Sequence, residues 1–75
     1  MSNKTVFEAD YFRVTVRVWR RAKQFTIADL SELTDISPQR LGVIENGGGA
    51  PTIAELSHLC EVMDESVTTF FKEKR

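Results

Sequence analysis

Apolar residues recur every three to four positions over most of the chain, so the pattern predicts short amphipathic helices separated by turns. The clearest run extends from Thr26 to Gly47, TIADLSELTDISPQRLGVIENG, and predicts a helix, a tight turn and a second helix. Four apolar residues of this run should face inward and lock the two helices at a steep angle: Leu30, Ile36, Leu41 and Ile44. The rest of the chain is organised around this pair of helices.

Capping residues mark where the two helices begin and end. Thr26, with an aspartate three positions later, has the pattern of a capping box, in which each side chain accepts a hydrogen bond from the other residue's backbone N–H. Ser37 before Pro38 predicts the second start, because a hydroxyl caps free N–H groups and proline has none to leave unpaired. Asp35 stands at the turn, where aspartate tolerates the left-handed backbone, and the Asn-Gly pair at 46–47 ends the second helix.

The segment before these helices is open to two interpretations. Residues 1–9 are expected to form a flexible leader, followed by a single domain over residues 10–75. Between residues 10 and 23, valines alternate with polar residues as in a strand, whereas Phe12, Val16 and Trp19 follow helical spacing, and we favour a helix. Its other apolar residues then form a second stripe that must face the C-terminal helix or another subunit: Tyr11, Val14 and Val18.

Two more helices are expected after the glycine loop at 47–49. Thr52 and Glu55 form a second capping box that starts a fourth helix. The apolar stripe of this helix should face the core and consists of Ile53, Leu56, Leu59, Cys60 and Met63. Ser66 is expected to cap a short fifth helix, VTTFF, over residues 67–71. The pattern therefore predicts an all-α domain with five helices.

The order of these signals resembles the helix-turn-helix of phage repressor/Cro-type (XRE-like) DNA-binding proteins. Members of that family typically have a Ser or Thr cap, a turn, a second Ser cap and an Ile-Glu-Asn-Gly segment that ends the recognition helix. The matching positions are Thr26, Asp35-Ile36, Ser37 and Ile44-Glu45-Asn46-Gly47, and the resemblance extends from about Phe12 to Phe71. It implies a lambda-repressor-like DNA-binding domain with the helix-turn-helix at helices 2 and 3, and a small sequence-specific transcription regulator.

The resemblance assigns roles to the outward side of the second of these helices. Base contacts fall on Gln39, Arg40 and Val43, since glutamine can bind adenine, arginine can bind guanine, and valine can contact only the methyl group of thymine. Phosphate contacts would come chiefly from backbone N–H groups at helix N-termini, with Arg13, Arg17 and Arg21 as electrostatic helpers. The residues assigned to the DNA backbone are Thr26, Ile27, Ser37, Asn46, Gly48 and Arg17.

Two further assignments concern contacts between helices and between subunits. In the family, an arginine near the end of the first helix commonly pairs with the glutamate of the Glu-Asn-Gly segment, and Arg20 and Glu45 stand at those positions. The dimer contact in the family often lies near the C-terminal helix, and the surplus of apolar residues favours a homodimer through Val18, Phe70 and Phe71. We expect Phe70 to face the core, Phe71 to face the partner, and the operator to be an inverted repeat.

The composition argues against several classes of function. Seventy-five residues, 41% of them hydrophobic and 28% charged, make one small globular domain rather than a disordered chain. The single histidine, His58, lies on a predicted exposed helix face without a catalytic partner, and the single cysteine, Cys60, falls at core spacing. The sequence has no metal-ligand cluster and no apolar run of membrane-spanning length. We therefore expect no enzyme activity, cofactor, metal or membrane contact, and a cytoplasmic protein.

The distribution of charge leaves a second function open. Residues 1–25 have a net charge of +4, whereas residues 26–51 have −3 and residues 52–75 have −2, so the helix-turn-helix itself is acidic. Surfaces that bind DNA are usually positive. Ile27 also stands where the family often has a phosphate-binding glutamine, and the loop after the motif has glycine in place of lysine or arginine. The alternative function is an interaction module on the same fold that binds or caps a partner regulator or enzyme.

Overall fold

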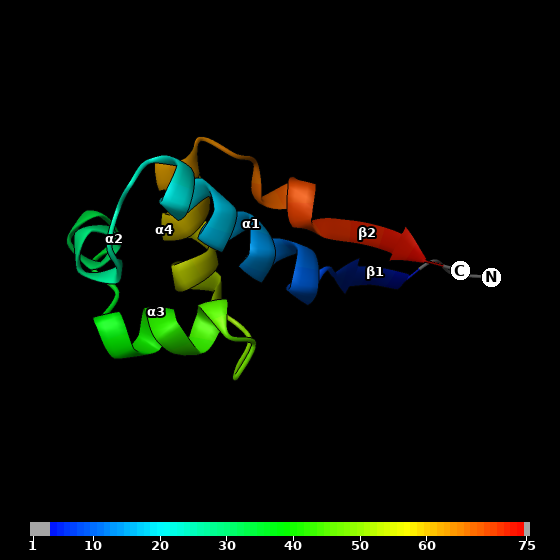
Figure 1. Cartoon of the computed structure of the whole chain (residues 1–75). Helices are drawn as coiled ribbons and strands as arrows, with labels where there is room; N and C mark the ends of the chain where they lie inside the picture. The colour runs from blue at the N-terminus through cyan, green and yellow to red at the C-terminus, as the bar shows by residue number, and fades with distance from the viewer. Residues whose placement is uncertain (1–3, 75) are drawn as a thin grey trace.

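The protein consists of a helical bundle and a two-stranded ribbon that projects from it (Figure 1). The computed structural model describes residues 4–74. In chain order these form β1 (Lys4–Phe7), α1 (Ala9–Ala22), α2 (Ile27–Thr34), α3 (Pro38–Glu45), α4 (Ile53–Met63), the 3-10 helix η1 (Val67–Phe70) and β2 (Phe71–Lys74). The strands pair antiparallel with Phe7 opposite Phe71. Because the ribbon projects from the bundle, the molecule is elongated, with extents of 45 × 22 × 19 Å.

Helix boundaries lie at the capping residues expected from the sequence. The Thr26 hydroxyl accepts a hydrogen bond from the Asp29 N–H, and the Asp29 carboxylate accepts one from the Thr26 N–H. A second capping box forms at Thr52, at the start of α4. Ser37 caps α3, and Asp35 adopts the left-handed backbone between α2 and α3, with φ of 60°. The predicted helix-turn-helix is therefore confirmed as α2 and α3.

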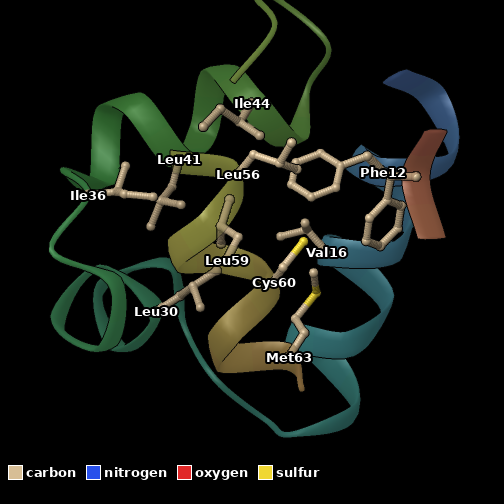
Figure 2. Close-up of a cluster of buried hydrophobic side chains, with 11 residues drawn as sticks. Phe12, Val16, Leu30, Ile36, Leu41, Ile44, Leu56, Leu59, Cys60 and Met63 are labelled. Atoms are coloured by element: carbon tan, nitrogen blue, oxygen red, sulfur yellow. The ribbon is translucent and has the colours of Figure 1, made fainter. Parts of the chain in front are cut away.

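The core lies between the four helices and takes side chains from all of them (Figure 2). The segment before the motif forms the helix α1 rather than a strand, with Phe12 and Val16 buried. Among the residues whose burial the structure describes, the buried apolar side chains are Phe12, Val16, Leu30, Ile36, Leu41, Ile44, Leu56, Leu59, Cys60, Met63 and Phe70. Ile53 was expected in the buried stripe of α4 but is 77% exposed, because this first residue of α4 lies at the edge of the stripe.

Both ends of the described chain differ from the expected fold. The count of five α-helices is wrong, because residues 67–71 form η1 and the start of β2. Residues 4–7, expected within a flexible leader, form β1, and the first three residues of that leader lie outside the described residues. These segments are rich in β-branched and aromatic residues, which pack well on a pleated surface. The Phe7 ring lies 5.3 Å from that of Phe71 and 5.5 Å from that of Phe12, so the ribbon is anchored on the core.

Candidate nucleic-acid interface

Helix α3 lies at the lower edge of the bundle in Figure 1. One row of its side chains is exposed. Gln39, Val43 and Asn46 form this row, at positions i, i+4 and i+7, and we call them the outer row. The opposite side of α3 is buried against the bundle and is apolar except for Glu45. In this row Gln39 and Val43 suit contacts to the edges of bases, whereas Asn46, assigned to the DNA backbone, accepts a hydrogen bond from Arg17.

Arg20 on α1 fixes α3 through the buried carboxylate of Glu45. Arg20 Nε donates a hydrogen bond to Glu45 Oε2 at 2.8 Å and Nη2 donates to Oε1 at 3.0 Å, and the two side chains are 12% and 4% exposed. The remaining nitrogen, Nη1, donates to the carbonyl oxygen of Phe25 at 2.8 Å. The hydrogen bonds to Glu45 raise the pKa of Arg20. Because two parallel bonds fix direction as well as distance, this pair orients α3 against α1.

The end of α3 is closed by backbone hydrogen bonds and by Arg17. The Gly48 N–H donates to the carbonyl oxygen of Val43 at 2.9 Å, and Gly47, with φ of 76°, provides the left-handed position of this Schellman cap. Arg17 Nη2 donates to the carbonyl oxygen of Glu45 at 3.0 Å and to Asn46 Oδ1 at 3.3 Å. Two groups assigned to DNA phosphate, the Gly48 N–H and the Arg17 guanidinium, are thus engaged within the subunit.

Arg40 is also engaged within the subunit, although the sequence places it among the base contacts. Its Nε donates to Glu55 Oε2 at 2.8 Å, and its Nη2 donates to Glu55 Oε1 at 2.9 Å and to the Ala50 carbonyl oxygen at 2.8 Å. Arg40 therefore turns toward α4 and bridges the glycine loop instead of pointing outward. Glu55 was not assigned a role beyond its cap. It lies fifteen residues from Arg40, beyond the reach of any helical spacing pattern.

We expect Arg40→Ala to lower the free energy of unfolding, because the loop over residues 47–51 then loses the side chain that holds it to α3. The hydrogen bond from Arg40 lowers the pKa of Glu55. A carboxylate with a lowered pKa stabilises the fold above its unfolded-state pKa and stops doing so as the pH falls through its folded-state pKa. Urea unfolding at several pH values should therefore give the full difference from wild type at neutral pH and a smaller difference in acid, where the hydrogen bond to the Ala50 carbonyl oxygen remains. An equal loss for Arg21→Ala, at an exposed residue, would contradict this role.

Replacement of Gly42 is expected to raise the free energy of unfolding, in contrast to replacement of Arg40. It lies inside α3, its φ is not in the left-handed region, and an added Cβ would meet no atom within 4 Å. Glycine in a helix interior is less stable than alanine by roughly 0.5–1 kcal/mol. Gly42→Ala should therefore raise the free energy of unfolding by about that amount in urea titrations. Gly47→Ala is the contrasting variant and should destabilise, since its Cβ would lie 3.2 Å from the Arg13 side chain at a positive φ.

The hydroxyl groups assigned to the DNA backbone serve as helix caps. Ser37 Oγ accepts from the Arg40 N–H at 3.1 Å, and Thr26 Oγ1 accepts from the Asp29 N–H at 3.0 Å. In the first turn of α2, the N–H groups of Ile27 and Ala28 lack acceptors within the helix. The Ile27 side chain is half-buried and packs against the core. The N-terminus of α2 thus offers backbone donors and no side-chain cation.

The aromatic residues assigned to a dimer contact occupy different environments. Phe70 is completely buried and packs edge-to-face on Phe12, with ring centroids 5.0 Å apart, so it belongs to the core. Phe71 is half-buried beside Phe7, and Val18 is 60% exposed on α1. Phe71 and Val18 are therefore the assigned residues that retain accessible surface.

Metal binding, thiol chemistry and membrane insertion each have structural requirements that can be compared with residues 4–74. Within that range, no group of three or more His, Cys, Asp and Glu side chains could hold a metal ion. Cys60 is buried, and its burial raises the pKa of the thiol, which disfavours the reactive thiolate. None of the helices described is long and apolar enough to cross a membrane.

Known proteins share this fold. A family model described as helix-turn-helix matches residues 16–70, and the chain therefore belongs to the helix-turn-helix family, of the phage repressor/Cro (XRE-like) type. Among solved structures, the chain is similar to SinR, the master regulator for biofilm formation, in a crystal structure in complex with DNA. The two are 25% identical, with a TM-score of 0.68 over 77% of this chain and 94% of that chain. No curated protein sequence matches the chain.

Proposed function

We propose that the protein is a transcription regulator that binds double-stranded DNA through the outer row of α3. The observation that carries the proposal is the geometry of this row, which is exposed on a helix fixed by the buried Arg20–Glu45 pair. Membership of the helix-turn-helix family and similarity to SinR, whose structure was determined with DNA, support the same function. In this proposal α3 enters the major groove, where Gln39 binds adenine and Val43 contacts the methyl group of thymine.

Affinity in this proposal comes from few charged contacts. Arg17 and Arg40 are engaged with groups of their own subunit, and the backbone N–H groups at the start of α2 are the donors to phosphate. Each phosphate neutralised by a cationic side chain releases counterions and steepens the dependence of binding on salt. We therefore expect a shallow salt dependence and a specificity carried mainly by shape and by the outer row.

The operator in this proposal is an inverted repeat that binds a homodimer. Two α3 helices related by a two-fold axis enter successive major grooves on one side of the duplex when the half-sites are about 10 bp apart, or roughly 34 Å. The half-buried Phe71 and the exposed Val18 are the apolar residues first assigned to the contact between subunits that retain accessible surface.

The Arg40–Glu55 pair favours one alternative, a module that binds a protein partner. This pair removes the positive charge of α3 from its outward side, and Leu33 and Ile53 add exposed apolar surface, at 52% and 77%. A regulator or enzyme with a complementary apolar surface would be the partner.

Selection of bound duplexes from a random DNA library decides between these functions. The full chain should enrich inverted repeats with half-sites about 10 bp apart. Gln39→Ala should lose the preference at one base pair of each half-site while remaining folded, because Gln39 is exposed and caps nothing. If wild type enriches no sequence at low salt, DNA binding fails and the protein-partner function takes its place.

A further inference from the structure

The ribbon of β1 and β2 is a feature of this chain outside the helix-turn-helix match, which covers residues 16–70. Each strand pairs with the other along one edge, and no described strand pairs with the opposite edges. An exposed strand edge is a template for another strand. The ribbon is anchored on the core but still offers an open edge with which a further strand can pair.

The backbone groups on the open edge of β1 follow from the register. The Glu8 N–H donates to the carbonyl oxygen of Phe70 at 2.7 Å, and Phe7 lies opposite Phe71. In an antiparallel pair, hydrogen-bonded and non-hydrogen-bonded residues alternate. Val6 therefore directs its backbone groups toward β2, whereas Thr5 and Phe7 direct theirs to the open edge. Glu8 directs only its N–H toward Phe70, because its carbonyl oxygen accepts from the Phe12 N–H at 2.9 Å.

The side chains of β1 form a pattern that is complementary to itself. Around Val6, Lys4 lies two positions before, and Glu8 lies two positions after, just past the end of β1 at the N-cap of α1. In the alternation of an extended chain, these two positions share the face of Val6. The Glu8 side chain makes no capping hydrogen bond at the start of α1, so its carboxylate is not used as a helix cap. An antiparallel copy of β1 centred on Val6 would place each lysine opposite a glutamate.

We propose that two copies of the protein dimerise through the open edge of β1, forming a four-stranded sheet in the order β2, β1, β1, β2. Thr5 and Phe7 exchange backbone hydrogen bonds with Phe7 and Thr5 of the partner subunit. Val6 packs against Val6 of the partner subunit at the two-fold axis, where a non-hydrogen-bonded pair brings side chains close together. Lys4 pairs with Glu8 of the partner subunit, twice per dimer.

The edge of β2 is a poorer choice for the same contact. There, the Phe71 N–H already donates to the carbonyl oxygen of Thr68. The equivalent two-fold pairing would also place Lys72 opposite Lys72 of the partner subunit, and like charges directly opposite one another destabilise a pair of strands. Charge and backbone geometry thus both select β1.

Charge reversal tests this dimer, which rests on the homodimer of the proposed function and adds the residues that form it. Sedimentation equilibrium of the full chain without DNA should show a dimer for wild type. Lys4→Glu and Glu8→Lys should each weaken association about tenfold, because each places two pairs of like charges across the axis. An equimolar mixture of the two variants should associate like wild type, since opposite charges then meet at both pairs. Lys72→Glu, on the other strand, is the matched control and should dimerise normally.

Two results would overturn the proposed dimer. A monomeric wild type at high micromolar concentration would show that Lys4 only protects the edge from pairing, and would overturn it. An equimolar mixture of Lys4→Glu and Glu8→Lys that associates no better than either variant alone would overturn it as well. This holds whatever the fold of each variant, which circular dichroism reports. Since no DNA is present, these results are independent of operator binding, which is measured separately on wild type.

Discussion

Glu45→Ala is expected to lose about 3–5 kcal/mol of unfolding free energy, because it leaves the Arg20 guanidinium without its carboxylate in a largely buried site. A domain of this size usually has a stability near the low end of the range that starts at about 5 kcal/mol, so the variant should be close to unfolded at 37 °C. Urea titration followed by circular dichroism measures the effect. Glu61→Ala, at an exposed residue of α4, is the matched control and should change stability by less than about 0.5 kcal/mol.

A double variant distinguishes the effect of the charges of Arg20 and Glu45 from the effect of the volume that their side chains fill. Arg20→Met combined with Glu45→Leu removes both charges and leaves apolar side chains, which often costs less than removal of one partner alone. The double variant should therefore be more stable than Glu45→Ala. Equal melting temperatures for Glu45→Ala and Glu61→Ala would show that the carboxylate does not hold α3.

The second large effect is expected on binding rather than on folding. Gln39→Ala should weaken binding to the selected operator by about 1–3 kcal/mol per half-site, the range for one bidentate contact to a base. Its stability should stay close to that of wild type, since Gln39 is exposed. Fluorescence anisotropy on the operator and on a duplex with altered half-sites measures both affinities. His58→Ala, at an exposed residue of α4, is the control and should bind both duplexes like wild type. A uniform loss on both duplexes would show that Gln39 does not read sequence.

Local patterns predicted the helices of this fold because their determinants are local. Thr26 with Asp29 and Thr52 with Glu55 form caps within one turn of helix, so sequence spacing alone indicates where α2 and α4 begin. The left-handed conformation of Asp35 is similarly a property of one residue and its neighbours. The buried side of each helix followed from periodicity, with Ile53 as the exception at the first position of α4.

The ribbon could not be predicted in this way because its partners are distant in sequence. Lys4–Phe7 and Phe71–Lys74 are each too short to indicate a strand alone. Their pairing depends on α1 and η1 bringing both ends of the chain to the same side of the bundle. Backbone hydrogen bonds between the ends, such as Glu8 to Phe70, then replace the expected fifth helix.

The candidate site shows the same division between local and distant determinants. Gln39 and Val43 lie where helical periodicity places them, on the outer row. The orientation of Arg40 depends instead on Glu55 and on the carbonyl oxygen of Ala50, which only the folded loop brings within reach. A family resemblance predicts where a residue lies along a helix. It does not predict where a long side chain points, because the surrounding charges set that direction.

Binding of DNA to the outer row of α3 is tested most directly by amide chemical shifts. The full chain is titrated with the selected duplex, with a scrambled duplex as the control, and shifts are followed residue by residue. Specific changes are expected at the amides of Ile27 and Ala28 and at those of Gln39 and Val43, with the far end of α4 unaffected. Absence of change at α3 with the selected duplex, or changes confined to Ile53 and the ribbon, would contradict it.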